Sequence, residues 1–243
     1  MSELRKPKGL FITGTDTGVG KSLVAAALSR MLVNRGIKVG VMKPAETGVE
    51  NCAELGPDAA LLKWASNSTQ ADEQICPYRL SAPVAPSVAA SRENIRIDYS
   101  QLCRQAQEII EQHDFTIIEG AGGLMVPLAG GLLMVDLVQA LALPLLVVCR
   151  PGLGTINHTL LTLFAARNMD LKIAGYLLNN MPAEKTIAEE TVAHTLATLA
   201  GDELLGILTT VEGDEQLKAE QLAEQISNLP TLSFLAGYLP EAF

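Results

Sequence analysis

Residues 12–23, ITGTDTGVGKSL, contain a pattern of glycines followed by a lysine and a serine that is suited to binding phosphate. Gly14, Gly20, Lys21 and Ser22 fit the spacing G-x-x-x-x-G-K-[ST]. Glycines let backbone N–H groups turn toward an anion, and the following helix adds the positive end of its dipole. Lys21 would reach the β- and γ-phosphates, and the Ser22 hydroxyl would ligate Mg²⁺. Such turns also occur without a ligand, but the apolar run before the motif and the helical pattern after it favour a nucleotide site.

Three more charged residues follow apolar runs or open a helical pattern. Lys43 closes a run before Pro44, and a cation there would stabilise a transferred phosphoryl group. Glu119 ends the run TIIE, where P-loop enzymes place the acid that holds Mg²⁺. With Asp58, these residues predict a magnesium site made of Ser22, Asp58 and Glu119. For Lys43 the alternative is a surface lysine whose aliphatic stem packs on the protein. For Asp58 the alternative is an acid in the first turn of a helix that only interacts favourably with the dipole of that helix.

These residues require a scaffold that brings strand ends together. Apolar, β-branched runs predict strands over residues 10–13, 39–43, 116–119, 145–149 and 173–179. Helical patterns alternate with them over residues 23–34, 101–112, 134–142 and 159–168. This alternation predicts an α/β fold of the P-loop NTPase type, with a mostly parallel sheet, helices on both faces and ligands at the carboxyl ends of the strands. Residues 211–228 are expected to form a polar, solvated helix without a chemical role.

Composition excludes several classes of function. The net charge of −9 and the lack of a basic run argue against a nucleic-acid partner. Four cysteines lie far apart and no signal-like segment opens the chain, which predicts reduced thiols and a cytoplasmic location. The three histidines lack zinc-ligand spacing. Apolar runs fall short of the roughly 20 residues that span a bilayer, so no membrane partner is expected. Residues 1–243 show no linker and are expected to form one domain.

Five stretches together resemble the dethiobiotin synthetase family of biotin biosynthesis. They are GTDTGVGKS (14–22), KPAETG (43–48), EGAGG (119–123), GTINH with LLT close behind (154–158 and 160–162), and AGYLLNN (174–180). The stretches span most of the chain, in the family's order and at similar spacing. The combination is far more specific than the phosphate loop alone.

The resemblance implies a ligase that closes a cyclic urea on 7,8-diaminopelargonic acid, using ATP, Mg²⁺ and CO₂, to give dethiobiotin, ADP and phosphate. One amine captures CO₂ as a carbamate, whose oxygen attacks the γ-phosphate to form a carbamic-phosphoric anhydride. The second amine then closes the ring and releases phosphate. Lys21 and Lys43 would be the catalytic cations, because they can stabilise charge on the carbamate and the phosphoryl group.

The resemblance also assigns binding residues. Thr47 stands where the family has a small hydroxyl residue that touches the diamine or its carbamate. Residues 206–210, GILTT, match a loop that borders the base, without its usual proline. ATP contacts are implied for Thr15, Gly18, Val19, Gly20, Lys21, Ser22, Leu23, Asp58, Glu119, Gly120, Ala121, Gly122, Asn179 and Asn180.

The family works as a homodimer with the diamine site near the interface. Gly154, Thr155, Ile156 and Asn157 are therefore candidate substrate contacts. The alternative is a plain strand-to-helix turn in which Asn157 is the N-cap.

Two other functions fit the phosphate loop. One is an amidoligase that activates a carboxylate, but those enzymes bring a glutamine-hydrolysing domain for which 243 residues leave no room. The other is a nucleotide switch of the chromosome-partitioning type, which has a signature lysine five residues before the loop lysine. This chain has Asp16 at that position, which disfavours the switch.

Overall fold

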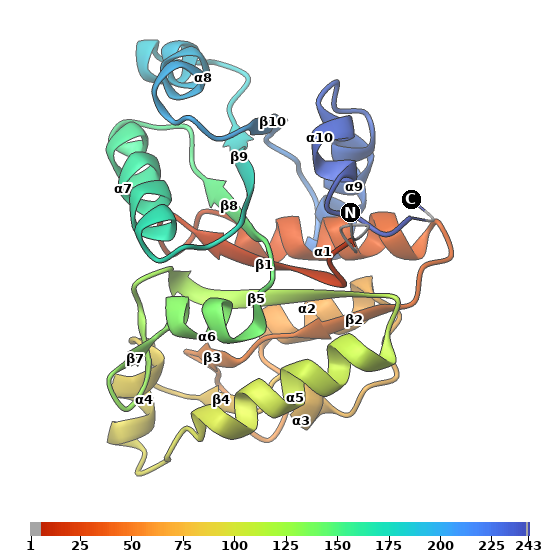
Figure 1. Cartoon of the computed structure of the whole chain (residues 1–243), viewed down its shortest axis with the longest axis vertical. Helices are drawn as coiled ribbons and strands as arrows, with labels where there is room; N and C mark the ends of the chain where they lie inside the picture. The colour runs from red at the N-terminus through yellow and green to blue at the C-terminus, as the bar shows by residue number, and fades with distance from the viewer. Residues whose placement is uncertain (1–5, 242) are drawn as a thin grey trace, which may run out of the picture.

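The computed structural model of the chain describes residues 6–241 and 243, and its centre is a six-stranded sheet (Figure 1). The strand order is β10-β9-β8-β1-β5-β2, and neighbouring strands pair in parallel. The strands of this sheet are β1 (Gly9–Gly14), β2 (Val39–Met42), β5 (Phe115–Gly123), β8 (Leu145–Cys149), β9 (Ile173–Met181) and β10 (Leu204–Thr209). The five predicted strands and the parallel P-loop-type arrangement are confirmed.

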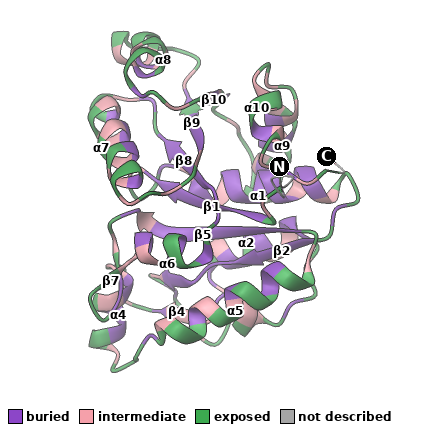
Figure 2. Cartoon of the chain, in the orientation of Figure 1, coloured by how far each residue is buried: buried purple, intermediate pink, exposed green. Residues whose placement is uncertain are grey.

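Helices cover both faces of the sheet, as predicted (Figure 1). One face packs against α1 (Lys21–Val33), α2 (Pro57–Ala65), α3 (Asp72–Ile75), α9 (Glu215–Ser227) and α10 (Leu232–Ala236). The other face packs against α4 (Pro86–Arg92), α5 (Tyr99–Gln112), α6 (Met134–Leu141), α7 (Thr155–Asn168) and α8 (Ile187–Leu199). Figure 2 shows the buried strands between these two layers. Residues that alternate along a strand enter opposite cores, as Leu10 and Phe11 do in β1.

Two small ribbons lie outside the central sheet. One pairs β3 (Ala45–Thr47) with β4 (Tyr78–Leu80) in parallel, and the other pairs β6 (Pro127–Ala129) with β7 (Leu132–Leu133) as a hairpin. The sequence patterns did not predict these ribbons or the edge strand β10. The strands of the ribbons have only two or three residues each, too few to establish a period.

Residues 211–228 correct one prediction. A helix forms there, but it is not solvated on all sides, because α9 packs against α1. Ala219, Leu222, Ala223 and Ile226 are buried, at the i, i+3, i+4, i+7 spacing of one helix face. The many Gln and Glu residues between them concealed that face. The packing brings Glu215, the first residue of α9, to the wall of the cavity beside the phosphate loop.

Candidate active site

The phosphate loop connects the central strand β1 to the N-terminus of α1. Gly18 and Gly20 have positive φ angles of 75° and 88°, which L side chains rarely adopt. A Cβ atom on Gly20 would also lie 2.1 Å from Nδ2 of Asn179. Glycine is therefore required at this point for two independent reasons, and the predicted strand–loop–helix context is confirmed.

The two polar residues that open α1 point toward the strand ends. The Lys21 ammonium is buried and donates a hydrogen bond to the Asp16 carbonyl across 3.1 Å. Burial lowers the pKa of Lys21 below its ordinary value. Ser22 Oγ donates to Glu119 Oε1 at 2.8 Å. Ser22 and Glu119 are thus in contact although 97 positions separate them in the chain.

Lys43 lies at the centre of a buried charge network. Its Nζ is 2.6 Å from Glu119 Oε1 and 2.7 Å from Asp58 Oδ2. The Lys43 side chain is only 3% exposed and that of Glu119 is fully buried, so Lys43 is not a surface lysine. Burial alone lowers the pKa of Lys43, but the two carboxylates outweigh it and hold that pKa above its ordinary value. Lys43 is therefore a fixed cation at the edge of the sheet.

The two carboxylates reach Lys43 from different elements. Glu119 lies within β5, beside Ile12 of β1, so it adjoins the strand that leads into the phosphate loop. Asp58 is in the first turn of α2 and points away from that helix toward Lys43. Burial raises the pKa of Glu119. At Asp58 the effect of burial is outweighed by the Lys43 charge, which lowers the pKa of that carboxyl.

The oxygen atoms of this network fit a magnesium ion that arrives with a nucleotide. Glu119 Oε2 is buried and has no hydrogen-bond partner among the described residues, which leaves one lone-pair donor free. Within residues 6–241 and 243, no three Asp, Glu, His or Cys side chains converge to hold a metal alone. Mg²⁺ takes few protein ligands and completes its shell with phosphates and water. Ser22, Asp58 and Glu119 match that requirement.

A cavity of about 620 Å³ opens beside the loop. It brings together several predicted residues: Gly18, Gly20, Lys21, Ser22, Leu23, Lys43, Thr47, Asp58, Ala121 and Gly122. Its other walls come from the segment Pro83–Pro86 before and at the start of α4, from Val126, and from Glu46 and Glu215. Sequence reasoning assigned no role to these. The signal for Glu46 was its place inside KPAETG, whereas only the packing of α9 on α1 places Glu215 here.

Other predicted nucleotide residues lie behind the loop rather than on the cavity wall. Val19 and Gly120 are buried, and the Thr15 backbone N–H donates to the Val148 carbonyl at 3.0 Å. Asn179 Nδ2 donates to the Val19 carbonyl at 3.0 Å, so its amide braces the loop from β9. The neighbouring Asn180 is exposed, with a φ of 64°.

Residues 206–210 are not a loop throughout. Gly206–Thr209 belong to the edge strand β10, and only Thr210 follows it. Leu229 crowds Gly206, where a Cβ atom would come within 2.5 Å of its side chain. The expectation of a loop is therefore wrong for residues 206–209, and its place beside the base stays a prediction.

The segment Gly154–Asn157 does not line the cavity of its own chain. The helix α7 begins at Thr155 and its N-cap is Gly154, so Asn157 is inside the first turn and the N-cap alternative is wrong. The Thr155 side chain is buried, while Asn157 is exposed.

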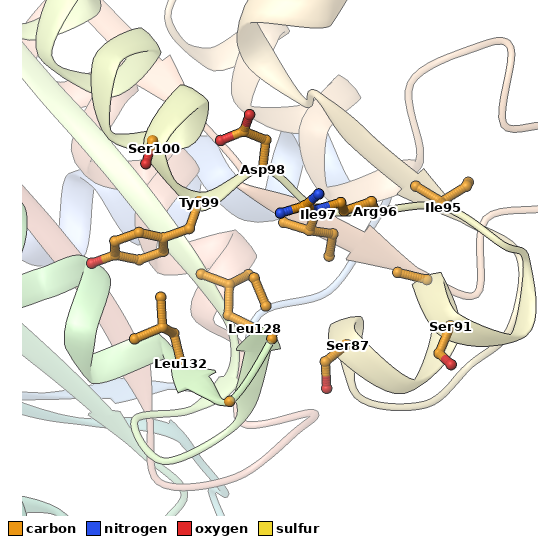
Figure 3. Close-up of a pocket in the computed structure, with 14 residues that line it drawn as sticks. Ser87, Ser91, Ile95, Arg96, Ile97, Asp98, Tyr99, Ser100, Leu128 and Leu132 are labelled. Carbon is orange, nitrogen blue, oxygen red and sulfur yellow. The ribbon is translucent and has the colours of Figure 1, made fainter.

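A second cavity, of about 790 Å³, lies on the other side of α4, between that helix and the β6–β7 hairpin. Figure 3 shows Ser87 and Ser91 of α4 on one side of the view, and Leu128, Leu132 and Tyr99 on the other. One of its polar groups already serves the fold, because the Tyr99 hydroxyl donates to the Asp136 carbonyl at 2.7 Å. We assign no chemistry to this cavity.

The parallel sheet and the loop define the class of P-loop nucleotide-binding proteins. Solved structures of this fold include a ParA family ATPase from Chlorobium tepidum TLS, with TM-score 0.57 and 13% identity, covering 94% of this chain and 98% of that one. Another is the MinC:MinD cell division complex of Aquifex aeolicus, with TM-score 0.54 and 15% identity, covering 95% and 93%. At such identities they show the fold alone. A family model described as AAA domain matches residues 8–221.

Relatives of higher identity are curated as ATP-dependent dethiobiotin synthetase BioD. That of Thermodesulfovibrio yellowstonii is 40% identical over 210 residues, covering 82% of this chain and 88% of the relative. That of Anaeromyxobacter dehalogenans is 42% identical over 201 residues, covering 83% and 89%. The chain belongs to the ATP-dependent dethiobiotin synthetase family, which closes a ring at the expense of ATP in biotin biosynthesis, and the resemblance seen in the sequence is confirmed. The chain is thus an enzyme, a ligase.

Proposed function

We propose that this chain closes the cyclic urea of dethiobiotin from 7,8-diaminopelargonic acid, CO₂ and ATP, with Lys43 as the central catalytic residue. The observation that carries this assignment is the position of the Lys43 ammonium. It stands between Asp58 and Glu119 at the edge of the cavity that Lys21 and Thr47 also line. A nucleotide switch does not need a second buried cation and a hydroxyl beside the phosphate loop.

The reaction needs positioning and charge stabilisation but no protein nucleophile. One amine of the diamine adds to CO₂ and loses a proton, and the carbamate oxygen attacks the γ-phosphorus while ADP leaves. The second amine then attacks the carbamate carbon, and phosphate leaves as the ring closes. Lys43 and Lys21 would stabilise the negative charge on the carbamate and phosphoryl oxygens. The Thr47 hydroxyl would bind the diamine or its carbamate.

Ser22, Asp58 and Glu119 are proposed to hold Mg²⁺. When bound, the ion would neutralise charge on the phosphate oxygens. Support comes from Glu119 Oε2, which has no hydrogen-bond partner in the part of the chain that the structure describes, and from the contact between Ser22 and Glu119. Asp58, about two-fifths exposed, remains accessible from the cavity.

The nucleotide is proposed to lie along the loop, with its phosphates over Gly18–Leu23 and Ala121–Gly122. Thr15, Val19 and Gly120 would shape the loop from behind. Asn179 and Asn180 are the proposed contacts of the base. Glu215 adds a carboxylate on the side of the cavity that α9 closes.

A homodimer is proposed because the predicted substrate segment, residues 154–157, does not line the cavity of its own chain. Gly154, Thr155, Ile156 and Asn157 are outside the cavity of their own chain, so they would reach the diamine of a second copy. Large apolar side chains are exposed beside them: Leu153 is 90% exposed, Leu161 57% and Phe164 63%. Exposed apolar groups of this size, gathered at the start and middle of α7, are typical of a covered interface.

The proposal covers residues 1–243 as one domain working in the cytoplasm. The four cysteines are free, as expected for reduced thiols. Within residues 6–241 and 243, none of the helices has the length and apolar character needed to cross a bilayer.

The deciding experiment measures phosphate release from ATP, Mg²⁺ and bicarbonate, with and without 7,8-diaminopelargonic acid. Mass spectrometry identifies the product. We expect phosphate release to require the diamine and to match the cyclic urea formed. Release that is independent of the diamine, or that depends on a macromolecule instead, would overturn the assignment.

A further inference from the structure

Glu46 is a buried carboxylate that none of the steps above uses. It lies in β3, directly before Thr47, and is only 5% exposed. Its two oxygens bind the start of α2: Oε1 accepts the Asp58 backbone N–H at 2.8 Å, and Oε2 accepts that of Ala59 at 3.0 Å. A side chain from the edge of the site therefore holds the backbone of the residue that pairs with Lys43.

The residues at the start of α2 cannot cap the helix themselves, so Glu46 accepts its free N–H groups. The N-cap position is Gly56, which has no side chain to accept a hydrogen bond, and Pro57 has no N–H. The first free donors of the helix are thus the N–H groups of Asp58 and Ala59. A carboxylate that receives both is also favoured by the helix dipole.

The Glu46 carboxylate lies so close to Gly56 that no side chain fits at position 56 without displacing it. A Cβ atom at position 56 would lie 2.4 Å from Glu46 Oε1 and 2.5 Å from Glu46 Cδ. The backbone at Gly56 has a φ of −69°, which any residue can adopt, so the need for glycine comes from the close approach of Glu46 alone.

The arrangement places two acids close together, which an ordinary helix cap would avoid. Burial and the neighbouring Asp58 carboxylate both raise the pKa of Glu46. A serine at position 56 would cap the helix without this repulsion, because its hydroxyl is neutral. Glu46 instead fixes the position from which Asp58 Oδ2 reaches Lys43 Nζ at 2.7 Å.

We infer that Glu46 is a positioning residue, whose two hydrogen bonds to α2 hold Asp58 in place for the metal–nucleotide site. The inference rests on the proposed role of Asp58 as a magnesium ligand. It predicts that disturbing Glu46 weakens metal binding, although Glu46 itself does not bind the metal.

The test is binding of Mn²⁺, as a paramagnetic substitute for Mg²⁺, to the full chain with a non-hydrolysable ATP analogue, followed by electron paramagnetic resonance. No diamine is present, so the outcome is independent of whether the ring-closing reaction is correct. We expect Glu46→Gln to weaken Mn²⁺ binding roughly tenfold, because residues that orient metal ligands commonly change affinity by that amount. Binding of the analogue without metal should not change.

The matched control is Asp98→Asn, which alters another helix-capping carboxylate. Asp98 accepts the Gln101 N–H at 2.9 Å at the start of α5, away from Lys43. Trp64, the chain's one tryptophan, lies in α2, so its fluorescence reports whether that helix stays docked. Unchanged emission with weaker Mn²⁺ binding supports a positional effect.

A second variant, Gly56→Ala, tests the same contact from the other side, because its methyl group would push the Glu46 carboxylate. We expect weaker Mn²⁺ binding there too, and less than the sum of the two effects in the double variant. If Glu46→Gln does not fold, Gly56→Ala decides by the same criteria. Wild-type Mn²⁺ affinity in the folded variants, or an equal loss in Asp98→Asn, would overturn the inference.

Discussion

Two parts of the proposed site differ in their relation to the cavity: the β1–β5–β2 side, called the completed side below, lines or adjoins it, whereas the β8–α7 side, called the unfinished side, lies outside it. On the β1–β5–β2 side, Lys43, Glu119, Asp58 and Ser22 are joined by contacts of 2.6–2.8 Å. On the β8–α7 side, the predicted substrate residues are not among those that line the cavity, and the buried Thr155 Oγ1 has no hydrogen-bond partner among the described residues. In the proposed homodimer, the residues for phosphate chemistry would come from one chain, and substrate recognition would also use the surface of a second chain.

The largest effect should come from the completed side. Lys43→Ala is expected to lower turnover about 10²–10³-fold, since removing one preorganised charge stabiliser has that effect in other enzymes. The fold should persist. The measurement is diamine-dependent phosphate release at saturating ATP.

Lys63→Ala is the matched control for Lys43→Ala. Lys63 also pairs with an acid, Asp72 at 2.6 Å, but both side chains are well exposed on the surface. Its turnover should equal that of the wild type. Normal turnover in Lys43→Ala would remove Lys43 from the mechanism.

Much of the completed side was predictable because it follows from local rules. Buried apolar runs identify β1, β2 and β5, and parallel pairing brings the residues after them to one edge, so the sequence alone groups Lys43 with Glu119. Asp58 was predictable as a magnesium ligand only in combination with other site residues, because its place at the start of a helix has a simpler explanation. The Lys43 ion pairs and the role of Glu46 depend on contacts between distant segments, which no period in the sequence encodes.

The unfinished side was less predictable for a physical reason. The start of α7 and the N-cap at Gly154 depend on a positive φ of 92° that a glycine-rich run permits at several positions. In the edge strand β10, burial does not alternate regularly, because Gly206 and Ile207 are consecutive residues outside the core, and the glycine interrupts the apolar run. Contact between α7 and a second copy of the chain cannot be predicted from the pattern of strands and helices, because it depends on the surface of that second copy.

The second prediction concerns stability of the completed side. Lys43→Met leaves Glu119 buried without its cation, and breaking a buried pair costs about 3 kcal/mol in the free energy of unfolding. Burial already raises the pKa of Glu119, and losing Lys43 raises it further. A carboxyl whose pKa is raised in the folded state costs stability at high pH, and that cost disappears as the pH falls and the group takes up a proton.

Urea unfolding at about pH 7.5 and about pH 5.5 measures this effect. The deficit of Lys43→Met relative to wild type should be smaller at the lower pH. Lys63→Met should lose less than about 1 kcal/mol at either pH, because its ion pair is exposed. A deficit of Lys43→Met that does not change with pH would mean that Lys21 or solvent compensates the negative charge of Glu119.

The third prediction tests whether the unfinished side needs a second copy. Phe164→Glu places a charge in the exposed apolar face of α7, and burying it would cost about 3 kcal/mol, which weakens a dimer roughly a hundredfold. We expect sedimentation to show monomers, with the ATP analogue still bound and diamine turnover lost. Phe234→Glu changes an exposed phenylalanine of α10, on the opposite face of the sheet, and should leave both unchanged. A monomeric Phe164→Glu protein with full turnover would show that one chain suffices.

The smallest expected effect comes from one exposed amide on the unfinished side. If Asn157 contacts the diamine, Asn157→Ala removes about 1 kcal/mol of binding, which is a roughly fivefold rise in KM for the diamine. The KM for ATP should not move, because Asn157 is not among the residues of the phosphate cavity. Asn168→Ala, at the other end of α7, is the control, since its amide donates to the Phe164 carbonyl of its own helix. A rise in the KM for ATP instead would place this segment over the nucleotide, and the two sides of the cavity would then form one continuous site.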